Sequence, residues 1–461
     1  MTISILRNHF EGSSLNAPVN AYLDWCAERL LNYQVPGALI GLVSGQGLDV
    51  LASFGHAHID GKVPFAPEHR FRIASITKLF TSVAIMQLHE RGNLSIHEPL
   101  SKFLPWFRSS SSNLDAITPW HLLTHSSGLS RESGMSYWND HKFPSLEQLK
   151  QHVAELEPVY APEFLWKYSN FGMALLGYTV SAVSGVSFED YLREHILSPL
   201  QMNDTLVSDP GAGHPSLATG YSRFSAPNST RAPAPHSDLN ALTAAGGMTT
   251  TIEDLAKFIH FNLVPEQFDI LKYETLREMH RVHWLDPSWE FGIGLGFLNT
   301  RVNGQTFLGH DGWIRGYRSS ILFATERQLG VILFFNCDFT PIQEFATKCF
   351  EFLPPSLPVN QTQAYPHRLS QVDLSKTVGL YTSQFGTCRI ADLDGALVIL
   401  YPSNPNALRT RECLEYVSEG RYRLHSTQGA GSRGETVKLI KDNDGRVLRV
   451  KVGTFFYDRV M

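Results

Sequence analysis

Apolar residues near the N-terminus follow a helical spacing, and two strand-like runs come after them. In the first stretch the apolar positions are Val19, Tyr22, Leu23, Cys26 and Leu30. A recurrence every three or four residues predicts a helix with one buried face. The runs GALIGLV and LDVLASF then flank the turn residues SGQG, which predicts an antiparallel hairpin.

The same arrangement occurs in reverse order between residues 317 and 353. The runs YRSSILFA and LGVILFFN flank the polar turn TERQ, and the helical stretch PIQEFATKCFEFL follows them. We expect strands from both regions to share one antiparallel sheet. The residues between them carry mostly helical patterns and long loops rich in proline, serine and glycine, which predicts an inserted, mostly helical subdomain. The fold class is therefore α/β (α+β), an antiparallel sheet flanked by helices.

The last hundred or so residues differ in pattern from the rest. Four prolines separated by polar residues predict a linker over 354–368: Pro354, Pro355, Pro358 and Pro366. Beyond it, KLIKDNDGRVLRVKVG alternates apolar and basic residues after an Asn-Asp-Gly turn. We predict a main domain over 1–353 and a small all-β domain over 369–461.

Composition removes several function classes. The chain of 461 residues has 39 Lys and Arg against 44 Asp and Glu, a net charge of -5, and no basic block, so we expect no nucleic-acid partner. The five cysteines are scattered without a CxxC pair, which argues against a disulfide framework or a zinc site. We expect neither a metal nor a cofactor.

Two segments bear on location. The N-terminal stretch MTISILRNHFEGSS lacks the apolar core of a secretion signal. Residues 168–188 carry no charge and are long enough for a membrane span, but their glycines, serines and Asn170 favour a buried helix. We therefore predict a cytoplasmic protein without a membrane span, and the oligomeric state stays open.

The stretch FRIASITKLFTSVAIMQLHERG carries the first candidate chemistry. Ser75 and Lys78 lie three residues apart at the start of an apolar helix, so they share one face. An apolar setting lowers the pKa of a lysine, and a neutral Lys78 could take the proton of the Ser75 hydroxyl. Alone, this spacing favours a capping serine and a lysine whose stem is buried.

Two further elements favour the catalytic interpretation. WKYSNFG offers the phenol of Tyr168 and the amide of Asn170 at the start of the uncharged helix. FLGHDGWIRGYRSS places His310 and Gly312 where we expect a strand to open, beside a bound acyl group. His125 in LTHSSG is interpreted as a structural hydrogen-bonding residue. Thr250 and Glu253 are predicted to form a capping box.

With these motifs, the chain resembles the serine β-lactamase and penicillin-binding-protein superfamily, in particular its class C β-lactamase-related esterase branch. The resemblance covers residues 16–353 and extends to LLTHSSGL and GGMTTTIEDLAKF. It implies a β-lactamase/transpeptidase-like fold, with Ser75 as nucleophile and Lys78 and Tyr168 as proton-transfer groups. Asn170, His310 and Gly312 match the family's substrate-binding positions. The β tail resembles, more weakly, the barrel-like domains of some members.

The strand motif departs from the family pattern. It reads His-Asp-Gly where typical β-lactamases have Lys-Thr-Gly, and a histidine with a pKa of about 6.5 is mostly neutral at pH 7. Arg315 is the nearby cation that could replace the lysine, and Trp313 is expected to line an acyl pocket. Weaker recognition of substrate carboxylates follows.

The expected function is that of a serine hydrolase forming an acyl-enzyme on Ser75, an esterase or an amidase/peptidase acting on a small ester, amide or lactam. The alternatives are a β-lactamase, a D-Ala-D-Ala carboxypeptidase, an acyltransferase, or a penicillin-binding or structural relative without turnover. Release of an acyl label from Ser75 separates turnover from its absence.

Overall fold

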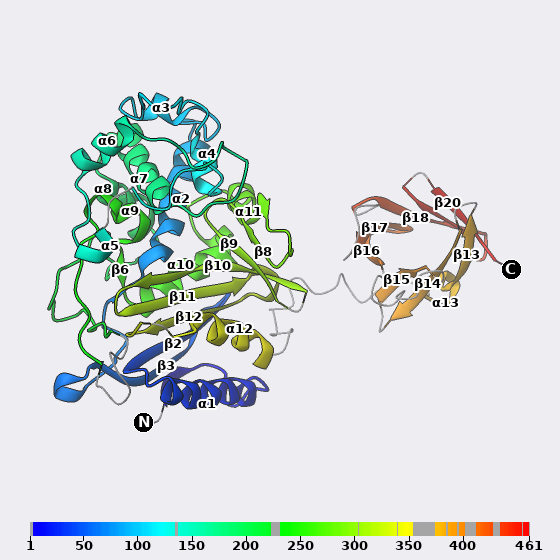
Figure 1. Ribbon diagram of the computed structural model, residues 1–461. Coiled ribbons are helices and arrows are strands. Elements are labelled where there is room, and N and C mark those ends of the chain that lie inside the picture. The colour runs from blue at the N-terminus through cyan, green and yellow to red at the C-terminus, as the bar shows by residue number, and fades with distance from the viewer. Residues whose placement is uncertain are drawn as a thin grey trace. The chain divides into compact units, whose positions relative to one another are not determined.

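The computed structural model describes residues 3–133, 137–222, 231–302, 304–338, 340–353, 374–383, 386–393, 396–401, 412–426, 434–453 and 455–460. Its chain divides into two compact units, Met1–Leu357 and Pro358–Met461. Figure 1 shows the helices and strands of both. The predicted linker 354–368 lies outside the described residues.

One large antiparallel sheet is the centre of the first unit. Its strands are hydrogen-bonded in the order β1-β3-β2-β12-β11-β10-β9-β8-β7, with β4 paired to β3. The pairing of β2 with β12 confirms that strands from both ends of the unit share a sheet. The strands are β1 (Ile3–Asn8), β2 (Gly37–Ser44), β3 (Gly47–His58), β4 (Val63–Pro64), β7 (Trp284–Leu285), β8 (Phe291–Ile293), β9 (Leu298–Val302), β10 (Gln305–Ile314), β11 (Tyr317–Ala324) and β12 (Leu329–Phe335).

Helices cover both faces of this sheet (Figure 1). Ala38, Ile40 and Leu42 of β2 belong to the core cluster that includes α1 (Asn16–Asn32) and α12 (Ile342–Phe352). Leu39 and Val43 face the other core, to which α2 (Thr77–Glu90), α7 (Asn170–Ser184) and α10 (Ile252–Leu263) contribute. Because successive side chains point to opposite faces and both faces are buried, the run GALIGLV is apolar throughout.

The predicted helical subdomain lies between β5 (Phe71–Arg72) and β6 (Thr249–Thr250), two short strands that pair with each other. Its helices are α3 (Leu100–Phe103), α4 (Pro119–Leu123), α5 (Tyr137–Asp140), α6 (Leu146–Ala154), α8 (Phe188–Leu192) and α9 (Thr243–Gly246), together with α2 and α7. In the main unit α11 (Tyr273–His280) follows α10. The predicted capping box is wrong by one position, because Thr251 is the residue whose side chain accepts from Asp254 N at the start of α10.

The uncharged stretch forms α7, which Ser169 caps by accepting from Gly172 N. In the described residues no single helix is long and apolar enough to cross a membrane. The bent pair Asn170–Ser184 and Phe188–Leu197 meets the criteria of length and composition jointly, but with an 81° bend between its halves. Most of α7 is buried in the core.

The second unit is a closed antiparallel barrel, which confirms the all-β prediction. Inward-facing apolar residues, among them Tyr381, Ile399, Tyr422 and Val450, form its core. A short helix, α13 (Leu374–Thr377), precedes the barrel. The strands are β13 (Gly379–Ser383), β14 (Gly386–Leu393), β15 (Ala396–Leu400), β16 (Glu412–Ser418), β17 (Arg421–Ser426), β18 (Thr436–Lys441), β19 (Val447–Val452) and β20 (Phe455–Arg459).

Candidate active site

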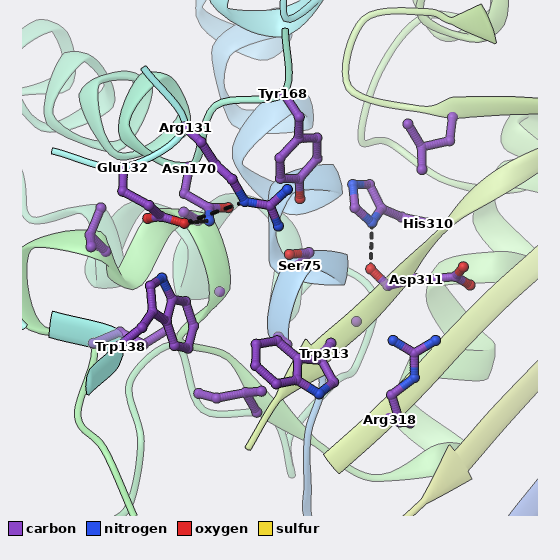
Figure 2. Close-up of a pocket in the computed structure, with 18 of the residues that line it drawn as sticks. Ser75, Arg131, Glu132, Trp138, Tyr168, Asn170, His310, Asp311, Trp313 and Arg318 are labelled. Carbon is purple, nitrogen blue, oxygen red and sulfur yellow. Dashed lines mark hydrogen bonds and ion pairs between the residues drawn. The ribbon is translucent and has the colours of Figure 1, made fainter. Parts of the chain in front are cut away.

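Ser75 lies in a tight 3₁₀ turn, Ala74–Ile76, that leads directly into α2. Ala74, the residue before it, has a φ of 46°, in the left-handed region that L residues seldom adopt. Such strain persists only where the surroundings impose it, and it is found most often at functional sites. The turn presents the half-buried Ser75 at the wall of a cavity (Figure 2).

Lys78 is buried, with a relative exposure of 1%, and it points back to the serine. Its Nζ donates to Ser75 Oγ at 2.9 Å and to the carbonyl oxygen of Ala245 at 2.6 Å. Burial lowers the pKa of Lys78 well below its usual value, and the charge of Arg131 adds to this, while Glu132 opposes it. The geometry therefore favours a neutral amine in contact with the serine hydroxyl.

Tyr168 also contacts the side chain of Ser75. Burial raises the pKa of Tyr168, opposed by a side-chain hydrogen bond with Ser75, so the group is a phenol and a proton donor near neutrality. Lys78 Nζ and the Arg131 guanidinium lie 4.9 Å and 5.1 Å from the centre of its ring. The neutral amine of Lys78 is therefore suited to act as the general base, and the phenol of Tyr168 is suited to act as the general acid.

The ring of His125 packs against the ring of Tyr168. The two rings are 4.5 Å apart, and His125 Nδ1 accepts from the backbone N–H of Ser169 at 3.3 Å. Its carbonyl oxygen also accepts from Lys167 N at 2.8 Å. Burial and the nearby charge of Lys78 lower the pKa of His125 well below its usual value. The contacts on both sides of Tyr168 agree with the structural role expected for this histidine.

The strand motif forms the wall opposite the helices. It does not open a strand as expected, because β10 already begins at Gln305 and His310 lies in its second half. At Gly312, β10 passes so close to the backbone of Ile73 that only a glycine fits. A Cβ there would lie 2.2 Å from the carbonyl oxygen of Ile73 and 2.1 Å from Ser319 Oγ. Ser319 Oγ donates to that carbonyl at 2.9 Å, which ties the sheet to the turn of Ser75.

His310 is a neutral acceptor in this wall. Its Nδ1 lies 2.7 Å from the carbonyl oxygen of Asp311, which only a protonated Nδ1 satisfies. Burial lowers the pKa of His310 to about 3, and the charge of Lys78 in its protonated form adds to this lowering. The sequence-based expectation of a pKa near 6.5 is wrong for this reason. The buried Nε2 has no hydrogen-bond partner among the described residues.

A carboxylate that the sequence analysis missed completes the helical wall. Glu132 Oε1 accepts from Asn170 Nδ2 at 2.7 Å, and Glu132 Oε2 accepts from the Tyr137 hydroxyl. Glu132 follows the loop LLTHSSGL by three residues, and as a charged loop residue it gave no signal of burial. Its contact with Asn170 spans 38 residues, which no local pattern reveals.

Most of these residues line one cavity of about 610 Å³, whereas the buried Lys78 and His125 lie behind its lining. Figure 2 shows several of them converging on Ser75. Arg315 is exposed and is not among the lining residues, so the structure corrects its predicted place. It lies in the turn between β10 and β11, whereas Arg318, the cross-strand partner of Trp313, lines the cavity. Six of the residues predicted from the sequence do line the cavity: Ser75, Tyr168, Asn170, His310, Gly312 and Trp313.

Aromatic side chains make up much of the remaining lining. Trp138 and Trp313 lie with ring centres 5.6 Å apart, and Trp166 lies 5.1 Å from Phe291. The charged groups occur in opposite pairs, Arg131 with Glu132 and Arg318 with Asp311. Within the part of the chain that the structure describes, no group of three or more His, Cys, Asp or Glu could hold a metal ion.

Comparison with known families gives the site its context. The family model described as Beta-lactamase matches residues 12–347. The chain belongs to the Beta-lactamase family. Among relatives, Protein flp of Staphylococcus aureus (strain MW2) is 27% identical over 322 residues, which span 69% of this chain and 62% of that protein. Beta-lactamase of Escherichia coli (strain K12) is 25% identical over 337 residues, 66% of this chain and 84% of that protein.

Solved structures of the same superfamily share the fold of this Beta-lactamase-family chain. The octameric penicillin-binding protein homologue from Pyrococcus abyssi has a TM-score of 0.65 at 24% identity, covering 95% of this chain and 99% of its own. The D-stereospecific amidohydrolase from Streptomyces sp. has a TM-score of 0.60 at 24% identity, covering 71% and 97%. At this identity the likeness concerns the fold.

Proposed function

We propose that the protein is a serine hydrolase that forms an acyl-enzyme on Ser75 and hydrolyses small esters or amides. The observation that carries the proposal is the 2.9 Å contact between Lys78 Nζ and Ser75 Oγ, with the amine buried and its pKa lowered. A neutral amine in contact with a hydroxyl is the arrangement of an activated nucleophile. Membership of the Beta-lactamase family supports the same reaction class.

In the proposed reaction, Ser75 Oγ adds to the carbonyl carbon while its proton passes to Lys78 Nζ. The carbonyl oxygen becomes an oxyanion, held by the backbone N–H of Ser75 and one near Trp313. When the oxyanion collapses, the C–O or C–N bond breaks. Tyr168 gives its proton to the leaving group and regains one from the Lys78 ammonium. Water then adds to the acyl-enzyme through the same transfers in reverse.

The charges around the cavity favour neutral substrates over anionic lactams. His310 stands where β-lactamases carry a lysine, and its pKa of about 3 keeps it neutral at working pH. Arg318 interacts with the charges of Asp311 and Asp338, and the Arg131 side chain is 64% exposed, so water screens its charge. A buried, unbalanced cation for a substrate carboxylate is therefore lacking among the described lining residues. Relatives named for lactam and amide hydrolysis keep both bonds among the candidates.

Labelling with a fluorophosphonate probe tests the nucleophile. The parent should be labelled, and Ser75→Ala should lose labelling and ester hydrolysis by about ten-thousandfold or more. Ser111→Ala, at an exposed serine, is the matched control and should react like the parent. A folded Ser75→Ala variant that is labelled as fast as the parent removes Ser75 from the mechanism. An acyl group that stays on Ser75 indefinitely would indicate a binding protein without turnover.

A further inference from the structure

The Glu132 carboxylate is the acidic group of the helical wall, and its position is fixed from two sides. Asn170 Nδ2 donates to Oε1 at 2.7 Å, and the Tyr137 hydroxyl donates to Oε2. The side chain retains a relative exposure of 20%, and it lines the cavity. A carboxylate offers about four lone-pair positions, so these two bonds leave capacity for a further donor. Figure 2 shows it beside Asn170, on the helical side of Ser75.

Arg131 does not cancel this charge for a ligand inside the cavity. Its Nε lies 3.6 Å from Glu132 Oε1, but the arginine side chain is 64% exposed. Its guanidinium lies over the ring of Tyr168, 5.1 Å from the centre. Ion pairs of such exposure contribute little, because water screens them. A cation inside the cavity, where the Glu132 side chain is only 20% exposed, can therefore gain more from the carboxylate than the exposed Arg131 does.

The neighbouring groups suit a compact cation with several donors. Because Asn170 Nδ2 is directed to Glu132, its Oδ1 is left as an acceptor. Trp138, next in the chain to Tyr137, lines the same cavity and offers an aromatic face, which attracts cations. An ammonium carries three donors and no acceptor, so it matches a carboxylate and an amide oxygen together. A second carboxylate in this place would be repelled.

We propose that Glu132 is an ammonium subsite and that the enzyme prefers acyl substrates with a free amino group near the scissile carbonyl, such as amino acid esters and amides. The proposal rests on the proposed serine-hydrolase function. It narrows the substrate class, because the Glu132 carboxylate does not attract a neutral acyl group and repels an anionic one.

The same carboxylate acts on the catalytic lysine. Glu132 raises the pKa of Lys78, against the larger lowering by burial. An ammonium bound at Glu132 offsets that influence and favours neutral Lys78 in the complex. Removing the charge by Glu132→Gln should likewise lower the pKa of Lys78 and move the acidic limb of the kcat/KM profile to lower pH.

The test uses matched methyl esters with and without the amine, phenylalanine methyl ester in both enantiomers and 3-phenylpropionic acid methyl ester. At pH 6.5 the parent should show a higher kcat/KM for at least one amino ester by about tenfold or more. The preference should fall as pH rises through the α-amino pKa of about 7.7 to 8.0, where the substrate loses its charge. Glu132→Gln should reduce the ratio of the two kcat/KM values by about ten- to a hundredfold.

Glu157→Gln is the matched control, since it removes one carboxylate at an exposed position outside the cavity lining. It should keep the parent ratio. A parent enzyme without a preference for the amino ester overturns the subsite. So does a Glu132→Gln variant in which kcat/KM falls by the same factor for both esters. If neither ester is hydrolysed and Ser75 takes no fluorophosphonate label, the serine-hydrolase function itself fails. Labelling and hydrolysis without an amine preference refute the subsite alone.

Discussion

The two sides of the active site differ in how their polar groups are hydrogen-bonded. We call the side with Ser75, Lys78 and Tyr168 the helical wall and the side formed by β10 the strand wall. On the helical wall, Lys78 Nζ donates to two oxygens and Tyr168 is hydrogen-bonded to Ser75 before any substrate is present. On the strand wall, His310 Nδ1 donates to the backbone carbonyl oxygen of Asp311, and its Nε2 is buried without a partner in the described structure. A buried acceptor without a donor costs free energy, so it is kept where a ligand can supply the donor.

The difference separates chemistry from recognition. The helical wall holds a base and an acid whose protonation states are set by burial, and it needs nothing from the substrate to be ready. The strand wall contributes shape, a neutral acceptor at His310 and the close approach at Gly312. Substitutions of the base and the acid, Lys78 and Tyr168, should therefore reduce the rate for all substrates. Substitution of a recognition group, His310 on the strand wall or Glu132 beside the helices, should change which substrate is preferred.

Replacing Lys78 by Arg should have the largest effect in this comparison. An arginine stays charged near neutrality and cannot accept the serine proton, so kcat/KM should fall by about a hundred- to ten-thousandfold for every ester. In the parent, kcat/KM should rise with pH as Lys78 loses its proton, at a pKa well below its usual value. Lys102→Arg, at an exposed lysine paired with Glu98, is the control. An unchanged rate in Lys78→Arg would move the base elsewhere.

An intermediate effect is expected at Gly312, where the two walls touch. A Cβ placed 2.2 Å from the Ile73 carbonyl oxygen must push β10 away from the turn of Ser75. Gly312→Ala should lower kcat by about a hundredfold, because small displacements of reacting groups are costly. Ser319→Ala removes only the hydrogen bond to Ile73 and should cost less. Equal losses in both variants would mean that the hydrogen bond, and not the close approach, matters.

The smallest effect should come from His310, and it should be one of selectivity. His310→Lys restores the cation of typical β-lactamases, so the kcat/KM ratio of a chromogenic cephalosporin to a neutral p-nitrophenyl ester should rise about ten- to a hundredfold. His310→Gln, which stays neutral, should not raise it. In the parent the ratio should be the same at pH 7 and pH 5.5, because the pKa of His310 is about 3. A parent that already prefers the cephalosporin at pH 7 would contradict the neutral-wall account.

What the sequence could predict follows from how local each feature is. Ser75 and Lys78 are one turn apart, so their spacing predicts that they share a helix face, and the structure places their side chains in contact there. The hairpins β2–β3 and β11–β12 could also be predicted from the sequence, because the strand patterns and the turn residues that define each hairpin are adjacent in the chain. The capping residue of α10 was misplaced by one, since Thr250 and Thr251 are chemically equivalent candidates.

Features that depend on distant packing could not be predicted. The pKa of His310 depends on burial beside Lys78, more than two hundred residues earlier in the sequence. Arg315 looked closer to the motif than Arg318, but the two-residue turn at Arg315 and Gly316 reverses the chain, so that Arg318 pairs with Trp313. The contact of Glu132 with Asn170 could not be predicted, because α5 and α6 lie between the two residues in the sequence.

The central claim is that turnover passes through an acyl group on Ser75. Rapid quenching during hydrolysis of a neutral ester, followed by tryptic mass spectrometry, measures this directly on the peptide that spans residues 73–78. We predict that this peptide gains the mass of the acyl group early in the reaction and returns to its original mass when the ester is exhausted. Steady turnover by a folded Ser75→Ala variant, with the acyl mass appearing on another residue, would contradict the account.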